Sequence, residues 1–167
     1  MLRDKNLVPL SRQHQHALAL CVRIDRALQA GEVADPTPWQ AEIKQLWDQE
    51  VAVHFAAEET FVFPAAVRFD ELRELVSELV DDHRKLREFV QHAADRQLNS
   101  DSLREFAQEL SQHIRKEERQ LFEALQKLLS ADEFAQLGTE LQSALAGTAE
   151  ACLLPSEATR LRPAGSK

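Results

Sequence analysis

Four long stretches of the chain carry apolar side chains at intervals of three and four residues, the period of an amphipathic helix. Gly, at 4 residues, and Pro, at 6, are too rare to interrupt them often. We therefore predict an all-α fold, an up-down-up-down four-helix bundle in which short loops join neighbouring helices. The stretches run from about Ser11 to Ala30, from near Pro38 through Phe63, from Asp70 to about Ala94, and from Leu103 to Leu128.

The ends of these stretches carry residues that stop or start helices. Gly31 and the segment Asp35-Pro-Thr-Pro38 follow the first stretch, and Pro64 is expected to bend or close the second. The segment Asn99-Ser-Asp-Ser102 offers N-cap side chains to the fourth. A shorter helix from about Ala131 to Ala146 is expected to cap the bundle, so we predict a domain over residues 1–148 and a flexible C-terminal tail over residues 149–167.

Charge and composition narrow the class of protein. The chain has 20 Lys and Arg against 28 Asp and Glu, a net charge of −8, so we expect no nucleic-acid or anionic membrane partner. No stretch reaches the roughly 18 uncharged apolar residues of a membrane span, and we expect a soluble, cytoplasmic protein. Cys21 and Cys152 lie far apart, which suggests neither a disulfide framework nor a thiolate zinc site.

Two of the predicted helices share a pattern of ionisable residues. Glu50-x-x-x-His54-x-x-x-Glu58-Glu59 is repeated 59 positions later as Glu109-x-x-x-His113-x-x-x-Glu117-Glu118. Residues four apart share one helix face, and here that face is the apolar stripe. Burying these four histidine and glutamate side chains without compensation would cost several kcal/mol or more. A bound cation removes that cost, so the pattern predicts a metal site.

The other two helices each offer one histidine. His83 lies on an inward stripe between Leu79 and Leu86, and we include it in the site. In the first helix His14 and His16 point to nearly opposite sides at about 100° per residue, so one site can use only one of them. The apolar surroundings of His14 match those of His83, and we choose His14.

Six side chains from four helices exceed what one tetrahedral zinc ion needs and suit two ions bridged by the carboxylates. Imidazole and carboxylate are normal iron ligands, although the same donors also fit manganese or zinc. The predicted metal ligands are His14, His54, Glu58, His83, His113 and Glu117.

The sequence from roughly Leu10 to Leu128 resembles the hemerythrin-like, or HHE cation-binding, family. The resemblance implies a non-haem di-iron centre with four histidine ligands and with Glu58 and Glu117 as bridging carboxylates. The segments that carry it are Leu10-Ser-Arg-Gln-His14, His54-Phe-Ala-Ala-Glu58-Glu-Thr-Phe-Val-Phe-Pro64, Asp82-His83-Arg-Lys-Leu86 and His113-Ile-Arg-Lys-Glu117-Glu-Arg-Gln-Leu-Phe122.

One position departs from the family pattern. Oxygen-carrying hemerythrins have a second histidine one turn after the third-helix ligand, and this chain has Arg87 there. The departure argues against a reversible oxygen-carrier role and leaves a coordination position open to water, peroxide, oxygen or nitric oxide. Arg87 itself is expected to be exposed, with pairing to a carboxylate at the vacated position as the alternative.

Carboxylates next to the ligands have two interpretations each. Glu59 and Glu118 lie about 100° round from the ligands and are expected at the surface, with hydrogen bonding to a ligand as the alternative. Glu50 and Glu109 lie one turn before a ligand histidine, where they are expected to be ordinary polar residues. Their alternative role is to accept the outer N–H of that imidazole or to extend the coordination shell.

Three classes of function follow. The leading hypothesis is a di-iron protein that binds or senses a small diatomic or peroxide ligand, or iron itself. The second is a di-iron enzyme acting on peroxide or nitric oxide, for which no acid or base beyond the ligands can be named, so no catalytic residue is predicted. The third is a non-catalytic helical interaction module that docks a partner through the helix after Ala131.

Overall fold

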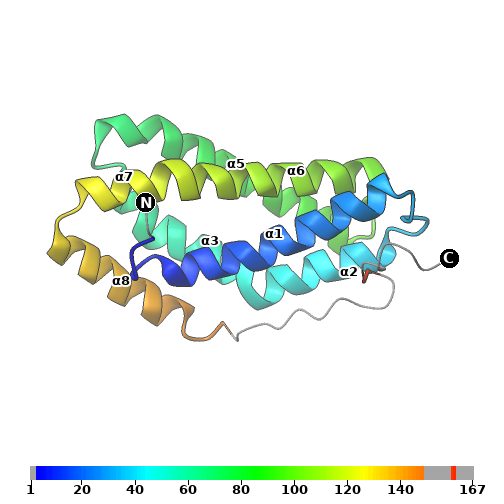
Figure 1. The fold of residues 1–167 in the computed structure, drawn as a ribbon, viewed down its shortest axis with the longest axis horizontal. Helices are drawn as coiled ribbons and strands as arrows, with labels where there is room; N and C mark the ends of the chain where they lie inside the picture. Colours follow the sequence, from blue (N-terminus) through cyan, green and yellow to red (C-terminus); the bar gives the residue numbers. More distant parts are fainter. Residues whose placement is uncertain (1–2, 149–158, 161–167) are drawn as a thin grey trace.

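The computed structural model describes residues 3–148 and 159–160, and in these ranges all regular structure is helical (Figure 1). The all-α prediction is confirmed. The elements are α1 (Val8–Gln29), α2 (Thr37–Leu46), η1 (Trp47–Val51), α3 (Ala52–Ala57), η2 (Glu58–Val62), α4 (Phe63–Ala66), η3 (Asp70–Leu72), α5 (Arg73–Ala94), α6 (Ser100–Lys116), η4 (Glu117–Leu121), α7 (Phe122–Leu128) and α8 (Ala131–Leu145).

Several elements follow one another without a break and form longer rods. The backbone stays helical from α2 through α4 and again from α6 through α7, with η1, η2 and η4 as widened π-helical turns inside them. Figure 1 shows α1, the α2–α4 rod, α5 and the α6–α7 rod lying alongside one another. Contacts join α1 to α6, α2 to α5 and α5 to α6.

Local sequence signals account for most helix ends. Gly31 has φ 69°, and the N–H of Glu32 donates to the carbonyl of Ala27, which closes α1. The side chain of Asn99 caps α6 through the N–H groups of Asp101 and Ser102.

Pro64 is the exception among these signals, because the helix does not close there and continues to Ala66. The π-helical turn η2 immediately precedes it. The π-helical turn changes the pattern of backbone hydrogen bonds next to Pro64, which has no N–H to donate. Of the two expectations for Pro64, closure of the helix is therefore wrong, and the rod ends three residues after Phe63.

The last helix, α8, folds back at one end of the molecule and packs against α1, α3 and η2. Ser130 and Glu133 form a capping box at its start. The predicted flexible tail lies outside the described residues except at Thr159 and Arg160. Thr159 is buried, and its hydroxyl donates to the carboxylate of Glu42.

The core consists of two apolar clusters with a layer of ionisable side chains between them. One cluster contains Ala17, Phe55, Leu86 and Leu110, and the other contains Leu10, Val62, Leu79 and Leu121. Along each rod the predicted ligands fall where the chain passes from one cluster to the other. The fold therefore encloses the candidate site on both sides with apolar packing.

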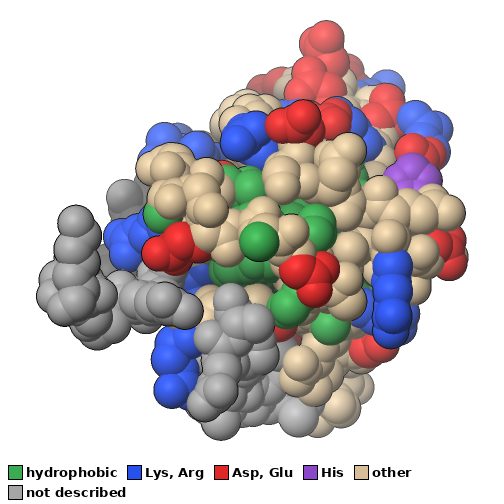
Figure 2. All heavy atoms as spheres, turned by 90° about the vertical axis from the view of Figure 1, so that its right-hand side faces the viewer, with side chains coloured by type: hydrophobic (Ala, Val, Ile, Leu, Met, Phe, Trp, Pro, Cys, Tyr) green, Lys and Arg blue, Asp and Glu red, His purple; other side chains and the backbone are tan. Residues whose placement is uncertain are grey.

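The surface is polar and mixed in charge at the end where α1 passes into α2. There, acidic and basic side chains surround a small group of hydrophobic ones (Figure 2). No helix in the described residues has an apolar stretch that could span a membrane. Cys21 is buried in the core, as a small core residue would be.

Candidate metal centre

Two of the π-helical turns begin at predicted ligands. Glu58 is the first residue of η2 and Glu117 is the first residue of η4, while His54 and His113 lie one turn earlier in α3 and α6. A π-helical turn inserts one extra residue per turn and often marks a functional site. The sequence repeat therefore corresponds to a structural repeat that presents one imidazole and one carboxylate from each rod.

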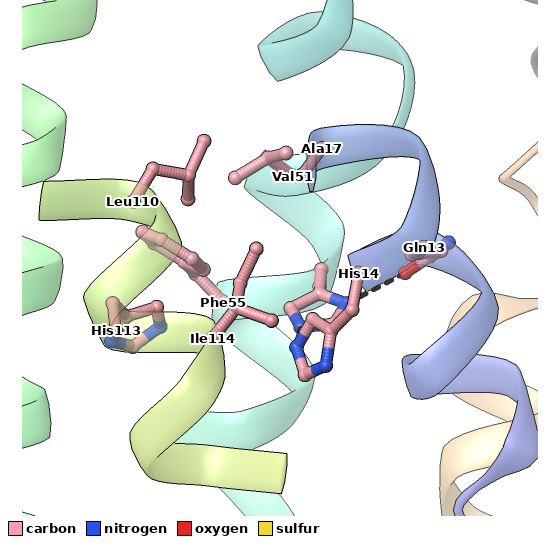
Figure 3. A pocket seen from close by; sticks show the side chains of 9 residues that line it. Gln13, His14, Ala17, Val51, Phe55, Leu110, His113 and Ile114 are labelled. Carbon is pink, nitrogen blue, oxygen red and sulfur yellow. Dashed lines mark hydrogen bonds between the residues drawn. The ribbon is translucent and has the colours of Figure 1, made fainter. Parts of the chain in front are cut away.

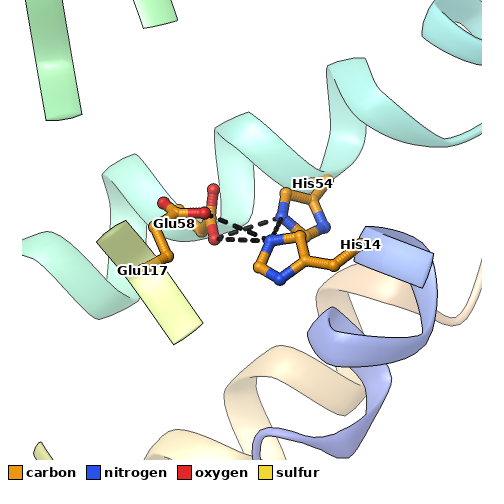
Figure 4. Close-up of side chains that lie close together, drawn as sticks. All are labelled: His14, His54, Glu58 and Glu117. Carbon is orange, nitrogen blue, oxygen red and sulfur yellow. Dashed lines mark hydrogen bonds and ion pairs between the residues drawn. The ribbon is translucent and has the colours of Figure 1, made fainter. Parts of the chain in front are cut away.

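The four imidazoles direct their Nε2 atoms toward the two carboxylates. In the first copy of the repeat, His54 Nε2 lies 3.1 Å from Oε1 of Glu58, and in the second His113 Nε2 lies 3.3 Å from Oε2 of Glu117. His14 Nε2 is 3.1 Å from Oε2 of Glu117. His83 Nε2 is 3.4 Å from Oε2 of Glu58. All six predicted ligands thus meet in one place, and Figure 4 shows four of them facing one another.

The six side chains divide into two groups that share both carboxylates. His14 and His54 with Glu58 and Glu117 form one group, and His83 and His113 with the same two glutamates form the other. In each group the potential ligand atoms all lie within 4.8 Å of one another. Either group can hold a metal ion with two nitrogen and two oxygen donors.

The six side chains are buried, so any of their polar atoms that lacks a hydrogen bond destabilises the fold. Glu58 and Glu117 are 0% exposed, and the four histidines are at most 4% exposed. Both oxygens of each glutamate, and Nε2 of His83 and of His113, make no hydrogen bond within the described residues, although they reach ion-pair distance of one another. Buried polar atoms left in this way each cost about 1–3 kcal/mol. Coordination to a cation would satisfy them, so the residues fit a bound metal.

The pKa values of the metal-free cluster are strongly perturbed. Burial lowers the pKa of His14, but Glu117 and Glu118 outweigh it and raise the value to about 10. Burial and the charge on His14 lower the pKa of His54 to about 3. Burial and Glu117 raise the pKa of Glu58 to about 7. Glu117 goes the other way, because His113 and His14 overcome burial and lower its pKa to about 2.

These pKa shifts mean that, without a metal, His14 carries a proton and Glu117 does not. The positive charge on His14 then offsets part of the negative charge of the buried carboxylates. Metal ligands must be deprotonated, so a cation entering this cluster displaces protons from it.

The outer Nδ1 atom of each histidine faces a side chain from another helix. Glu118 Oε1 lies 2.7 Å from Nδ1 of His14, and Gln13 Oε1 lies 2.8 Å from Nδ1 of His54. Glu59 Oε1 lies 2.8 Å from Nδ1 of His83, and Asp82 Oδ2 lies 3.5 Å from Nδ1 of His113. The three contacts at 2.7–2.8 Å are hydrogen bonds that fix the ring orientation and leave Nε2 free for a metal, whereas Asp82 lies only within ion-pair distance of His113. We call Gln13, Glu59, Asp82 and Glu118 the outer partners.

The outer partners form a closed ring around the site. Each belongs to one rod and contacts the histidine of the next rod in chain order, with Glu118 on the last rod closing the ring on His14 of the first. Behind each charged partner is a cation, with Arg3 on Glu118, Arg87 on Glu59 and Lys116 on Asp82. The ring therefore joins all four rods through polar contacts.

The structure decides between several interpretations of the sequence. Glu59 and Glu118 hydrogen-bond to predicted ligand histidines, so the alternative to a surface position is correct for both. Glu50 does contact an imidazole, but it is that of the exposed His16, at 3.0 Å, and Glu109 contacts Lys85. His14, not His16, lies in the cluster.

Sequence reasoning missed Gln13 and Asp82. The one signal that could have found them is position, because each directly precedes a ligand histidine, as Glu59 and Glu118 directly follow a ligand glutamate.

A narrow apolar pocket reaches the His14 and His54 side of the site (Figure 3). Besides Gln13 and three of the ligand histidines, its lining is aliphatic or aromatic: Ala17, Val51, Phe55, Leu110 and Ile114. The lining suits a small uncharged molecule better than an ion.

Comparison with known proteins gives one match. The family model of the hemerythrin HHE cation-binding domain matches residues 8–125, which include all six predicted ligands and the outer partners. The comparisons with curated proteins and with solved structures gave no match. The match spans most of the chain, and the geometry above is that of a cation site. The chain therefore belongs to the hemerythrin HHE cation-binding domain family.

Proposed function

We propose that this chain is a non-haem di-iron protein that binds or senses a small ligand, such as oxygen, nitric oxide or peroxide, or iron itself. The proposed architecture is an up-down-up-down four-helix bundle with α8 as an added helix. One ion is held by His14 and His54, and the other by His83 and His113. Glu58 and Glu117 bridge the two ions.

The observation that carries the proposal is the sharing of both carboxylates by two ligand groups. A single ion would use one group and leave the two remaining histidines buried with unsatisfied nitrogens. Two ions use all six side chains. Iron is proposed because imidazole with carboxylate is a normal iron environment and the family binds cations.

A binding or sensing role is favoured over an enzyme by the pocket. A di-iron enzyme acting on peroxide or nitric oxide would gain from a proton donor placed beside the open coordination position. The pocket lining supplies the ligand histidines, the neutral amide of Gln13 and apolar side chains. Steady-state turnover of peroxide or nitric oxide by the iron-loaded protein would support the enzyme instead.

The proposal is tested by metal analysis and ultraviolet-visible spectra of protein purified without chelator. The expected result is iron close to two ions per chain and, after oxidation, absorption from an oxo-bridged ferric pair. Near-zero iron after anaerobic incubation with ferrous salt, with no change in thermal stability, would overturn it. Tight binding of manganese or zinc alone would keep the site but reject iron.

A further inference from the structure

We infer that α8 controls the metal ligand His54 through Thr148 and Gln13, so that docking of this helix and occupancy of the His14 and His54 half of the site depend on each other. The inference rests on the proposed metal centre and adds a regulatory element to it. Thr148 and α8 lie outside residues 8–125, where the family model matches.

A chain of three hydrogen bonds runs from the ligand to the end of α8. His54 Nδ1 lies 2.8 Å from Oε1 of Gln13, and Gln13 Nε2 donates to the hydroxyl of Thr148 at 3.0 Å. The Thr148 hydroxyl in turn donates to the carbonyl of Leu145, the last residue of α8, at 2.6 Å. The two bonds beyond His54 both point toward α8, since Gln13 donates to Thr148 and Thr148 donates to Leu145.

The direction of this chain fixes the tautomer of His54. A carboxamide presents an acceptor on one side and a donor on the other, and the Thr148 hydroxyl takes the donor side. The amide oxygen must then face His54, and it can only accept, so Nδ1 carries the hydrogen and Nε2 keeps its lone pair. Without Thr148 the amide can turn over and present its NH₂ group to Nδ1, which favours the tautomer that cannot bind a metal through Nε2.

His54 is the histidine for which such control matters most. The other three ligand histidines face carboxylates, which can only accept, so either orientation of the carboxylate favours the same tautomer. Gln13 is the only neutral member of the outer partners. Its orientation depends on a group outside the four rods.

The packing of α8 places Thr148 where it can act. Leu137, Leu141 and Leu145 on α8 are buried in the same apolar cluster as Leu10 and Val62. Gly138 lies so close to Asn6 that a Cβ there would be 2.2 Å from the Asn6 Oδ1 atom. At the other end, Arg68 Nη2 lies 2.6 Å from Oε1 of Glu133. The docked helix is therefore held along its length, and its end brings Thr148 to Gln13.

Reciprocity follows from thermodynamic linkage. If docked α8 favours the metal-binding tautomer of His54, a metal on His54 must favour docked α8 by the same factor. Metal occupancy and the docking of α8 are then coupled, and each can be measured through the other.

The test compares Thr148→Val with Thr139→Val in the full-length chain. Both substitutions replace a hydroxyl by a methyl group of similar shape, and Thr139 is an exposed residue of α8 whose hydroxyl donates only to its own helix. Ferrous iron is titrated anaerobically against a competing chelator. Thr148→Val should weaken binding of one of the two ions on the order of tenfold. This is the lower end of the usual loss of metal affinity when a residue that hydrogen-bonds to a metal ligand is replaced. Thr139→Val should match the wild type, and Thr148→Ser should restore wild-type affinity.

A second measurement reads the mechanism without metal. Ring-nitrogen chemical shifts of His54 in the chelator-treated protein should show the Nδ1–H tautomer in the wild type and in Thr148→Ser. Thr148→Val should show a mixture of tautomers. An unchanged Nδ1–H signal together with wild-type iron affinity in Thr148→Val would overturn the inference.

The outcomes separate this inference from the proposed function. A wild-type protein that takes up no iron contradicts the proposed di-iron function, whatever the variants do. Wild-type protein that binds iron, with Thr148→Val and Thr139→Val indistinguishable from it, leaves the metal centre in place and rejects only the control by α8.

Discussion

Arg87 Nη1 lies 2.8 Å from Oε1 of Glu59, and that same oxygen is 2.8 Å from Nδ1 of His83. The guanidinium also lies 5.5 Å from the centre of the Phe55 ring, which stacks on His83 at 3.6 Å. The residue at the position where oxygen carriers have their additional histidine therefore supports His83 from behind. The alternative that Arg87 pairs with a carboxylate is the one the structure shows.

Arg87→Gln should weaken iron binding on the order of tenfold, because Glu59 loses the cation that orients it on His83. Arg84→Gln is the matched control, since Arg84 also lies on α5 but pairs with Asp81 at the surface, at 2.7 Å. Anaerobic iron titration of both variants measures the effect. Equal affinities would mean that Arg87 does not act on the site.

Glu58→Gln should abolish binding of both ions, because both ligand groups use this carboxylate. His83→Ala should lower the iron content to about one ion per chain, since the His14 and His54 group keeps its donors. Glu109→Gln is the control, because Glu109 binds Lys85 outside the cluster. Metal analysis after desalting distinguishes the variants, and retention of one full ion in Glu58→Gln would contradict the shared bridge.

In the metal-free protein, the contribution of Glu58 to stability should fall as pH rises through the weakly acidic range. Burial and Glu117 raise the pKa of Glu58 from 4.5 to about 7, so the folded chain binds this proton more tightly than the unfolded chain. The stabilisation is complete below pH 4.5 and is lost as pH rises through about 7. His54 acts in the opposite direction, because its pKa is lowered from 6.5 to about 3, so urea unfolding with chelator present must compare variants. The difference from Glu58→Gln isolates the group, and parallel pH profiles would contradict it.

Gly138→Ala should destabilise the protein by about 1–3 kcal/mol, the usual cost of overfilling a packed contact. The added Cβ would lie 2.7 Å from the Asn6 Cβ as well as close to the Asn6 amide. Rotation of the amide group alone therefore cannot relieve the clash. Gly147→Ala has nothing within 4 Å of the added atom and serves as the control. Denaturant unfolding compares them. Equal stability of the two variants would show that α8 does not dock as described.

Saturating the site with metal should stabilise the fold. Free ferrous iron at about 100 times its dissociation constant should add about 2.7 kcal/mol to the free energy of unfolding. Thermal unfolding with and without chelator measures this. The gain should disappear in Glu58→Gln, whereas an unchanged melting temperature in the wild type would support the interaction-module alternative.

Helix content and most helix ends could be predicted because they depend on local signals. The apolar stripe around His83, the Asn99 cap and the glycine at position 31 each act within a few residues. The π-helical turns at Glu58 and Glu117 could not be predicted, because the spacing of apolar residues in these segments fits an ordinary α-helix. The rod also continues past Pro64, directly after one of these turns.

The six predicted metal ligands could be found from the sequence, because their helical phase places each of them on the apolar stripe of its own helix. The outer partners could not, because Gln13 and Asp82 contact histidines of neighbouring rods, and the register between rods is not encoded in the period of either one. The pairing of Glu50 with His16 has the same origin. Contacts within a helix can be read from spacing, whereas contacts between helices required the structure.

The most direct test of the central claim is anomalous X-ray diffraction at the iron edge from crystals of the iron-loaded protein. The account predicts two peaks, one against Nε2 of His14 and His54 and the other against Nε2 of His83 and His113, both in contact with Glu58 and Glu117. A single peak, or peaks away from these six side chains, would contradict it.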